Sequence, residues 1–284
     1  MEQKPSSLGY IFLALLLSFI SLFFSVFVLK VVSLYLNLES AWGIYIKISI
    51  QTIFMFGIPP IILRTFGVKP PVFGKLSEIS PVQKRIFILG LISWVLSVIP
   101  VQMLSYLNSM IHFPDRWSEI EKILRTLQET SEQFLHQLLS TEGVIHFYIL
   151  TVVIAVIPAI FEEFFFRGCL QSLIINYTGK VWSSIVISSL VFSMYHGEFY
   201  SILPRLFLGI VLGMAYYSSR KLWIPVILHF LNNFASLVAY RIFATSDLDV
   251  LWLIWGKFFG FISAVILIIA VIVILRRMKE IASN

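Results

Sequence analysis

The chain has 284 residues, of which 58% are hydrophobic and only 13% are charged, and its formal net charge is +6. Soluble domains contain roughly 45–50% apolar and about 25% charged residues, so this composition excludes an ordinary water-soluble protein. The basic residues are scattered between apolar stretches instead of forming one patch, which argues against a nucleic-acid partner. The single cysteine, Cys169, excludes an intramolecular disulfide and a cysteine-based metal cluster. The sequence therefore predicts an integral, multi-pass membrane protein.

Apolar stretches close to the roughly 20 residues needed to cross a bilayer recur along the chain. Backbone polar groups must be paired in lipid, and these stretches lack the alternation of a membrane barrel, so the expected fold is an all-α bundle of about eight transmembrane helices. An excess of Lys and Arg in the connections on one side favours cytoplasmic locations for both termini. The expected spans are Leu8–Leu29, Trp42–Leu63, Ile86–Leu107, Val144–Arg167, Val181–His196, Ile202–Ser218, Leu222–Phe243 and Phe258–Leu275.

The longest stretch outside these spans, Asp115–Ser140, repeats apolar residues three or four apart with charges between them, which predicts an amphipathic extramembrane helix. Ser118 followed by Glu121 fits a capping box at its start. Such a helix lies on the outer membrane interface or packs over the bundle, or else it is a lid over a substrate site.

The chain is interpreted as one membrane domain. Its expected parts are three spans in 1–111, the extramembrane helix in 112–143, the candidate catalytic helices in 144–243, and a last span with a basic tail in 244–284.

Three charged side chains stand out because charges inside a bilayer are costly and usually have partners or a function. Glu162, Glu163 and Arg167 continue the apolar helix that begins near Val144. Pro158, one turn earlier, should kink this helix or free a backbone carbonyl. Side chains four apart share a helix face, so Glu163 and Arg167 are expected to pair. Glu162 then remains for binding a water or a proton, although both glutamates could equally serve as structural partners of Arg167.

Two further polar pairs have helical spacing on later spans. Phe192 and His196 are four apart at the end of the fifth span, and His229 and Asn233 are four apart in the seventh. A lone histidine near a membrane end is more often a packing residue. A glutamate, two histidines and an asparagine on three helices at similar depth are more informative, because a bundle can bring them to one cavity.

The motifs Glu162-Glu163-x-x-x-Arg167, Phe192-x-x-x-His196 and His229-x-x-x-Asn233 resemble, in order, the three motifs of the CPBP family of intramembrane proteases, which includes the type 2 CAAX prenyl proteases. The resemblance covers about Val144 to Tyr240. It implies a membrane endopeptidase in which Glu162, assisted by His196, activates a water, while His229 and Asn233 stabilise the oxyanion and Glu163, Arg167 and Phe192 support them. The implied partners are membrane lipid and a peptide or lipidated protein substrate.

Alternatives to a metal-independent glutamate protease remain. Glu162, His196 and His229 have the ligand types of a catalytic zinc site, but the sequence has no His-Glu-x-x-His helix, so no cofactor is the preferred interpretation. A different class of function is a transporter or scaffold whose buried charges form a proton or ion path. A third is an immunity or regulatory member of the same family. Matching halves, which would favour a transporter, are not found in the sequence.

Overall fold

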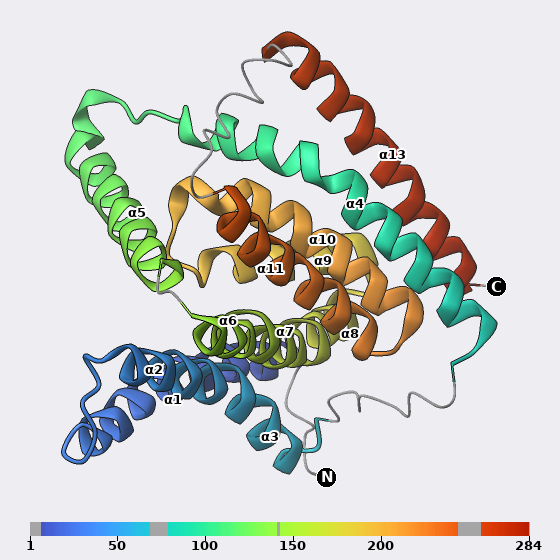
Figure 1. Cartoon of the computed structure of the whole chain (residues 1–284). Helices are drawn as coiled ribbons and strands as arrows, with labels where there is room; N and C mark the ends of the chain where they lie inside the picture. The colour runs from blue at the N-terminus through green and yellow to red at the C-terminus, as the bar shows by residue number, and fades with distance from the viewer. Residues whose placement is uncertain (1–6, 69–78, 141–142, 244–256, 284) are drawn as a thin grey trace. The chain divides into compact units, whose positions relative to one another are not determined.

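A computed structural model describes residues 7–68, 79–140, 143–243 and 257–283 of the chain, and every regular element in these ranges is helical (Figure 1). Seven of the helices are long and apolar enough to cross a membrane, and an eighth apolar helix, α9, is shorter, with 14 residues. The predicted all-α, multi-pass membrane fold is therefore confirmed. The cytoplasmic location of the termini stays a prediction, and part of the predicted loop before the last span, 244–256, lies outside the described residues.

Most helices begin and end within about five residues of the predicted spans. The exceptions are the spans beginning at Val144 and Phe258, which continue well past their predicted ends. Their bounds are α1 Ser7–Val32, α2 Ala41–Thr52 continuing through a π-helical turn at Ile53–Gly57 into α3 Ile58–Thr65, α4 Pro81–Ser109, α9 Val181–Met194, α10 Ile202–Ser219, α11 Trp223–Phe243 and α13 Lys257–Ser283. The extramembrane helix is α5 Ser118–Leu139, after a 3-10 turn at Asp115–Trp117.

The helix that begins at Val144 is not uniformly α-helical. It consists of α6 Val144–Leu150, a π-helical turn at Thr151–Val156, α7 Ile157–Glu163, a second π-helical turn at Phe164–Gln171 and α8 Ser172–Thr178. Pro158 near the start of α7 cannot donate a backbone hydrogen bond, which accounts for the irregular hydrogen bonding before it. π-helical turns on either side of α7 therefore frame the two glutamates at its end.

The described helices group into two compact units. The first comprises Met1–Leu76, Glu142–Ser184 and Arg220–Phe234, and the second comprises Ser77–Thr141, Ile185–Ser219 and Ala235–Asn284. The helices α9 and α11 thus contribute their first residues to the first unit and the remainder to the second.

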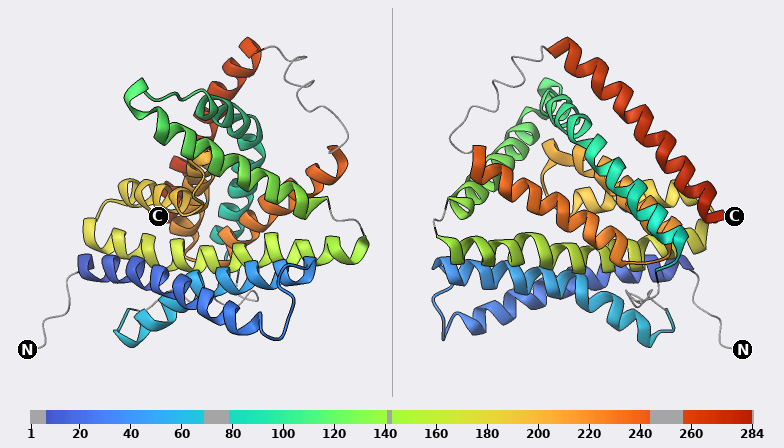
Figure 2. Two further views of the ribbon diagram at one scale, coloured as in Figure 1. Left: turned by 90° about the vertical axis from the view of Figure 1, so that its left-hand side faces the viewer. Right: turned by 45° about the vertical axis from the view of Figure 1, so that its right-hand side comes forward.

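In the first unit, α1 and the helix from α2 to α3 pack along the helix that carries α6, α7 and α8 (Figure 2). Aromatic rings fill this contact: the ring of Phe56 lies 5.7 Å from that of Phe165 and 5.3 Å from that of Phe166. Gly57 allows the close approach, since a Cβ at this position would lie 2.8 Å from the Phe161 ring. The backbone around Glu162 is therefore held by packing against α2 and α3.

In the second unit, α4 packs against both α10 and α13. A Cβ at Gly209 of α10 would lie 2.8 Å from the Cβ of Ser189, so small residues bring α9 and α10 together. α5 has two different faces, as its amphipathic sequence predicts. The polar residues Arg125, Gln128 and Ser131 are half-buried. Several large apolar side chains of α5 are exposed, as a helix at a membrane interface requires: Ile120, Ile123, Leu127, Phe134 and Leu135.

The predicted capping box of α5 is wrong. Trp117 stands at the N-cap, and it makes no capping hydrogen bond through its side chain. The carboxylate of Glu121 is engaged elsewhere: Oε2 accepts from the backbone N–H of Phe113 at 2.8 Å, and Oε1 accepts from Nε of Arg125 at 2.8 Å. The chain before the helix folds back onto Glu121, and that longer-range contact replaces the local one.

Candidate functional site

Glu162, Glu163 and Arg167 are all buried, with 8%, 0% and 1% of their surfaces exposed. The Arg167 Nη1 donates a hydrogen bond of 2.7 Å to Oε1 of Glu163, which confirms the ion pair predicted from their spacing. An arginine in an apolar helix is costly, and pairing with a carboxylate within one turn reduces that cost. The pair joins the end of α7 to the π-helical turn that follows it.

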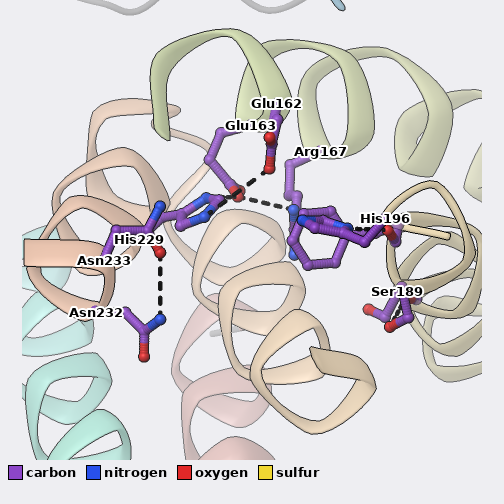
Figure 3. Close-up of polar contacts among 10 residues, drawn as sticks. Glu162, Glu163, Arg167, Ser189, His196, His229, Asn232 and Asn233 are labelled. Atoms are coloured by element: carbon purple, nitrogen blue, oxygen red, sulfur yellow. Dashed lines mark hydrogen bonds and ion pairs between the residues drawn. The ribbon is translucent and has the colours of Figure 1, made fainter. Parts of the chain in front are cut away.

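His229 of α11 lies beside the carboxylates of Glu162 and Glu163 (Figure 3). Its Nδ1 lies 2.8 Å from Oε1 of Glu163, and its Nε2 lies 4.0 Å from Oε2 of Glu162. A carboxylate is an acceptor, so Nδ1 carries the proton in this contact. The imidazole is thereby fixed with Nε2 on the side of Glu162, and His229 itself is only 3% exposed.

Asn233, one helical turn after His229, contacts the backbone of the glutamate-bearing helix. Its Nδ2 donates to the carbonyl of Ile154 at 3.2 Å, while Nδ2 of Asn232 lies 3.3 Å from its Oδ1. Ile154 is four residues before Pro158, which has no N–H to give to that carbonyl. The carbonyl that Pro158 was expected to free is therefore bound by a side chain of α11.

Five of the predicted site residues, Glu162, Glu163, Arg167, His229 and Asn233, lie in the first unit. The structure brings Glu162, Glu163, Arg167 and His229 together, and Asn233 lies one turn further along α11.

Phe192 and His196 lie in the second unit, and their local geometry is well defined. His196 is two residues past the end of α9 instead of within it. Its Nδ1 lies 2.9 Å from the carbonyl of Phe192, and the two rings meet edge to face with centroids 4.9 Å apart. A carbonyl oxygen accepts, so Nδ1 of His196 carries a proton in this contact. The spacing of the Phe192-x-x-x-His196 motif is thus explained by a contact that fixes the imidazole tautomer.

A metal-binding arrangement is not found in the described part of the chain. Within these residues no group of three or more His, Cys, Asp or Glu side chains is placed to hold a metal ion. Glu162 and His229 approach each other, but the Nδ1 of His229 is directed at Glu163, which is itself paired with Arg167. The zinc alternative, with Glu162, His196 and His229 as ligands, stays a prediction, and no chemical step is assigned to a metal.

Two kinds of polar contact are not evident from the sequence. Asn232, whose amide contacts Asn233, has no distinctive spacing, because the two residues are adjacent in one helix. Glu198 and Arg205 form an ion pair between the segment that follows His196 and α10. Their proximity to His196 in the sequence was the available signal, since acidic and basic residues flanking a motif are candidates for its support.

The fold and this cluster define a class of protein: a multi-pass helical membrane protein with a buried glutamate–arginine–histidine site. Residues 144–235 match the family model for type II CAAX prenyl endopeptidase Rce1-like proteins. The matched segment contains all three sequence motifs, so the predicted resemblance to the CPBP and CAAX protease family is confirmed there. No curated protein and no solved structure matches the chain.

Proposed function

We propose that the protein is an intramembrane endopeptidase that hydrolyses peptide bonds with a water activated by Glu162. The observation that carries this proposal is that His229 of α11 meets Glu162 and Glu163 of α7 at one buried point. The family match over the same residues supports it, because that family is named for endopeptidase activity. Paired carboxylates and an oriented imidazole in an apolar site are the groups that acid–base hydrolysis requires.

In this mechanism Glu162, assisted by His196, takes a proton from the water, and the resulting hydroxide attacks the carbonyl carbon of the peptide bond. The tetrahedral oxyanion then collapses, the carbon–nitrogen bond breaks, and the proton held by Glu162 passes to the leaving amine. Glu163 and Arg167 hold His229 and the end of α7 in place. Phe192 holds His196 through its backbone carbonyl.

His229 and Asn233 serve the oxyanion. Because Nδ1 of His229 donates to Glu163, its Nε2 can donate a hydrogen bond only when the ring is protonated. A protonated ring gives the cluster two cations, His229 and Arg167, against two carboxylates, a charge balance that suits a membrane interior. Protonated His229 then stabilises a developing negative charge beside Glu162.

The amide of Asn233 carries two hydrogens, and one of them is directed at the Ile154 carbonyl. The second is the donor assigned to the oxyanion. A donor held by a backbone contact is preorganised, so it needs little rearrangement when charge develops on the substrate. Asn233 therefore has a structural and a catalytic role in this proposal.

The proposed substrates are peptides or lipidated proteins at the membrane, and the family name points to prenylated C-terminal segments. The test is cleavage of an internally quenched fluorescent peptide, with and without a farnesyl group, by the full chain in proteoliposomes. We expect cleavage by the wild type, and a fall in kcat of about 10²–10⁴-fold for Glu162→Gln, the contribution typical of a general base. The control is Glu39→Gln, which alters a glutamate with an 86% exposed side chain.

Two results would contradict the glutamate mechanism, and a third would limit the proposed substrate. Undiminished turnover by folded Glu162→Gln would remove the glutamate from the mechanism. Loss of wild-type activity with a chelator, restored by added zinc, would replace the glutamate mechanism with a metal-dependent one. Equal cleavage of the farnesylated and unmodified peptides would retain the peptidase and reject prenyl recognition.

A further inference from the structure

The segment that follows His196 is held at four consecutive residues. It runs from Glu198 through the 3-10 turn Phe199–Ser201 and leads directly into α10. Loops usually carry fewer fixed contacts than the helices they connect. Here each residue of 198–201 contacts a side chain of α4 or α5, so the backbone just after His196 is constrained along its length.

Glu198 makes the strongest of these contacts. The Ser131 hydroxyl of α5 donates to its Oε1 at 2.6 Å, and Nη2 of Arg205 in α10 donates to its Oε2. Burial alone would raise the pKa of Glu198, but the Ser131 hydrogen bond, Arg205 and the nearby His196 lower it on balance. Glu198 is therefore a charged anchor two residues from His196, bound from two different helices.

The three following residues are anchored by different chemistry. Asn108 of α4 donates from Nδ2 to the Phe199 carbonyl at 3.1 Å and accepts at Oδ1 from the Leu203 N–H at 2.8 Å. Asn108 is 1% exposed, so this two-point contact is sheltered from water. It also satisfies a backbone donor in the first turn of α10, which has no partner within its own helix.

The remaining two anchors come from α5. The Arg125 guanidinium lies 4.4 Å from the centre of the Tyr200 ring, and Nε2 of Gln128 donates to the Ser201 hydroxyl at 3.1 Å. Arg125, Gln128 and Ser131 are spaced three residues apart, so they form one polar stripe on α5. This stripe faces the segment that follows His196, whereas the apolar residues named above are exposed.

We propose that Glu198 is a positioning residue for His196, and that α5 acts through Ser131 to hold it. This inference deepens the proposed function and rests on it, because His196 is assigned there to the activation of water. The Nδ1 contact with the Phe192 carbonyl fixes the tautomer of His196, and the Glu198 anchor fixes the backbone on its other side. An extramembrane helix thereby sets the geometry of a histidine at the end of a membrane helix.

Three variants test the proposal by their effect on turnover. Glu198→Ala removes both anchors, whereas Glu198→Gln keeps an acceptor for Ser131, and Glu129→Gln removes an exposed carboxylate of α5 as the control. We expect Glu198→Ala to lower kcat per folded enzyme by about 10–100-fold, the cost of a misplaced catalytic group. We expect its KM to change by less than about twofold, because the substrate contacts are intact. Glu198→Gln should recover most of kcat, and Glu129→Gln should match the wild type.

A second measurement needs no substrate. The chain has five histidines, so ring nitrogen NMR signals of ¹⁵N-labelled protein in micelles can be assigned with His196→Gln. We expect the wild type to show the Nδ1–H tautomer at His196, and Glu198→Ala to show a mixture of tautomers. A merely structural role would lower the melting temperature and leave this signal unchanged.

The outcomes separate this inference from the proposed function. If the wild type cleaves, Glu162→Gln does not, and Glu198→Ala retains both kcat and the His196 signal, the positioning role is wrong and the peptidase stands. If the wild type cleaves nothing while Glu198→Ala still changes the His196 signal, the positioning of this ring is supported and the peptidase proposal fails.

Discussion

His229 of α11 and Glu163 of α7, 66 residues apart in the chain, are joined by a contact of 2.8 Å between Nδ1 and Oε1. The same Glu163 oxygen accepts from Arg167 at 2.7 Å. One carboxylate oxygen therefore connects an arginine of its own helix to a histidine of another. Glu163 is the structural centre of the cluster, and Glu162 is at its edge, 4.0 Å from Nε2 of His229.

The buried Glu163–Arg167 pair predicts non-additive stability. Arg167→Met alone leaves a buried carboxylate without its cation and should lower the free energy of unfolding by about 3–5 kcal/mol. Glu163→Gln alone leaves the guanidinium in the same position and should also destabilise. The double variant buries no net charge and keeps an amide oxygen for His229, so it should recover most of the loss.

The measurement is denaturation of each variant in detergent micelles, treated as a double-mutant cycle. A double variant no more stable than the two single variants would show that the pair makes no coupled contribution. The double variant should still cleave substrate poorly, because the charge that orients His229 is absent.

The sequence predicted contacts that lie within one helix better than contacts between helices. Glu163 and Arg167 are four residues apart on one helix, and their pairing follows from helical geometry. The partner of His229 could not be predicted in this way. Helical spacing identifies the face of α11 that carries His229, but it does not identify the helix that this face contacts. The family resemblance assigned Glu163 and His229 to one site, yet it gave no indication that His229 binds Glu163 directly.

Local rules failed where tertiary contacts compete with them. Ser118 and Glu121 have the spacing of a capping box, but Glu121 binds Phe113 and Arg125 instead. Pro158 was expected to disturb its helix, and π-helical turns are found around α7. The side chain that binds the Ile154 carbonyl, Asn233, lies on another helix, so no local pattern could identify it.

The contact between Asn233 and Ile154 predicts that the two roles of Asn233 can be separated. Asn233→Ala should destabilise the fold by about 1–3 kcal/mol, the cost of leaving a partly buried carbonyl without a donor. In a Pro158→Ala background the new backbone N–H at 158 can supply that donor, so the same substitution should cost much less stability. The loss of peptide cleavage should persist, since the oxyanion donor is still absent.

Thermal unfolding and kcat of the four proteins in this cycle give the test. If restoring the backbone donor also restored kcat in the double variant, Asn233 would act only by holding the helix. If Pro158→Ala left the stability cost of Asn233→Ala unchanged, the carbonyl of Ile154 would not be the reason for that cost.

The close approach of Gly57 to Phe161 predicts that a single methyl group will disturb the site. In Gly57→Ala the new Cβ would lie 2.8 Å from Cδ1 of Phe161, which must then move. Overpacking of this kind costs about 1–3 kcal/mol, and Phe161 directly precedes Glu162 in α7. We expect lower melting temperature and lower kcat together, both partly restored by adding Phe161→Leu. Gly57→Ala with unchanged stability and turnover would contradict this packing.

The Glu121 contacts predict a pH-dependent attachment of α5. The backbone N–H of Phe113, with the side chains of Arg125 and His112, lowers the pKa of Glu121 from 4.5 to about 2. A carboxyl whose pKa is lower in the folded state stabilises that state above its unfolded pKa, and this contribution is lost as the pH falls through the folded pKa.

The melting temperature of the wild type should therefore exceed that of Glu121→Gln by a constant amount above about pH 4.5. The difference should shrink at lower pH and disappear near the lowered pKa of about 2. Glu119→Gln, a change at an exposed residue two positions before Glu121, should show no such dependence. A difference for Glu121→Gln that stayed constant down to about pH 3 would show that the carboxylate charge does not hold α5.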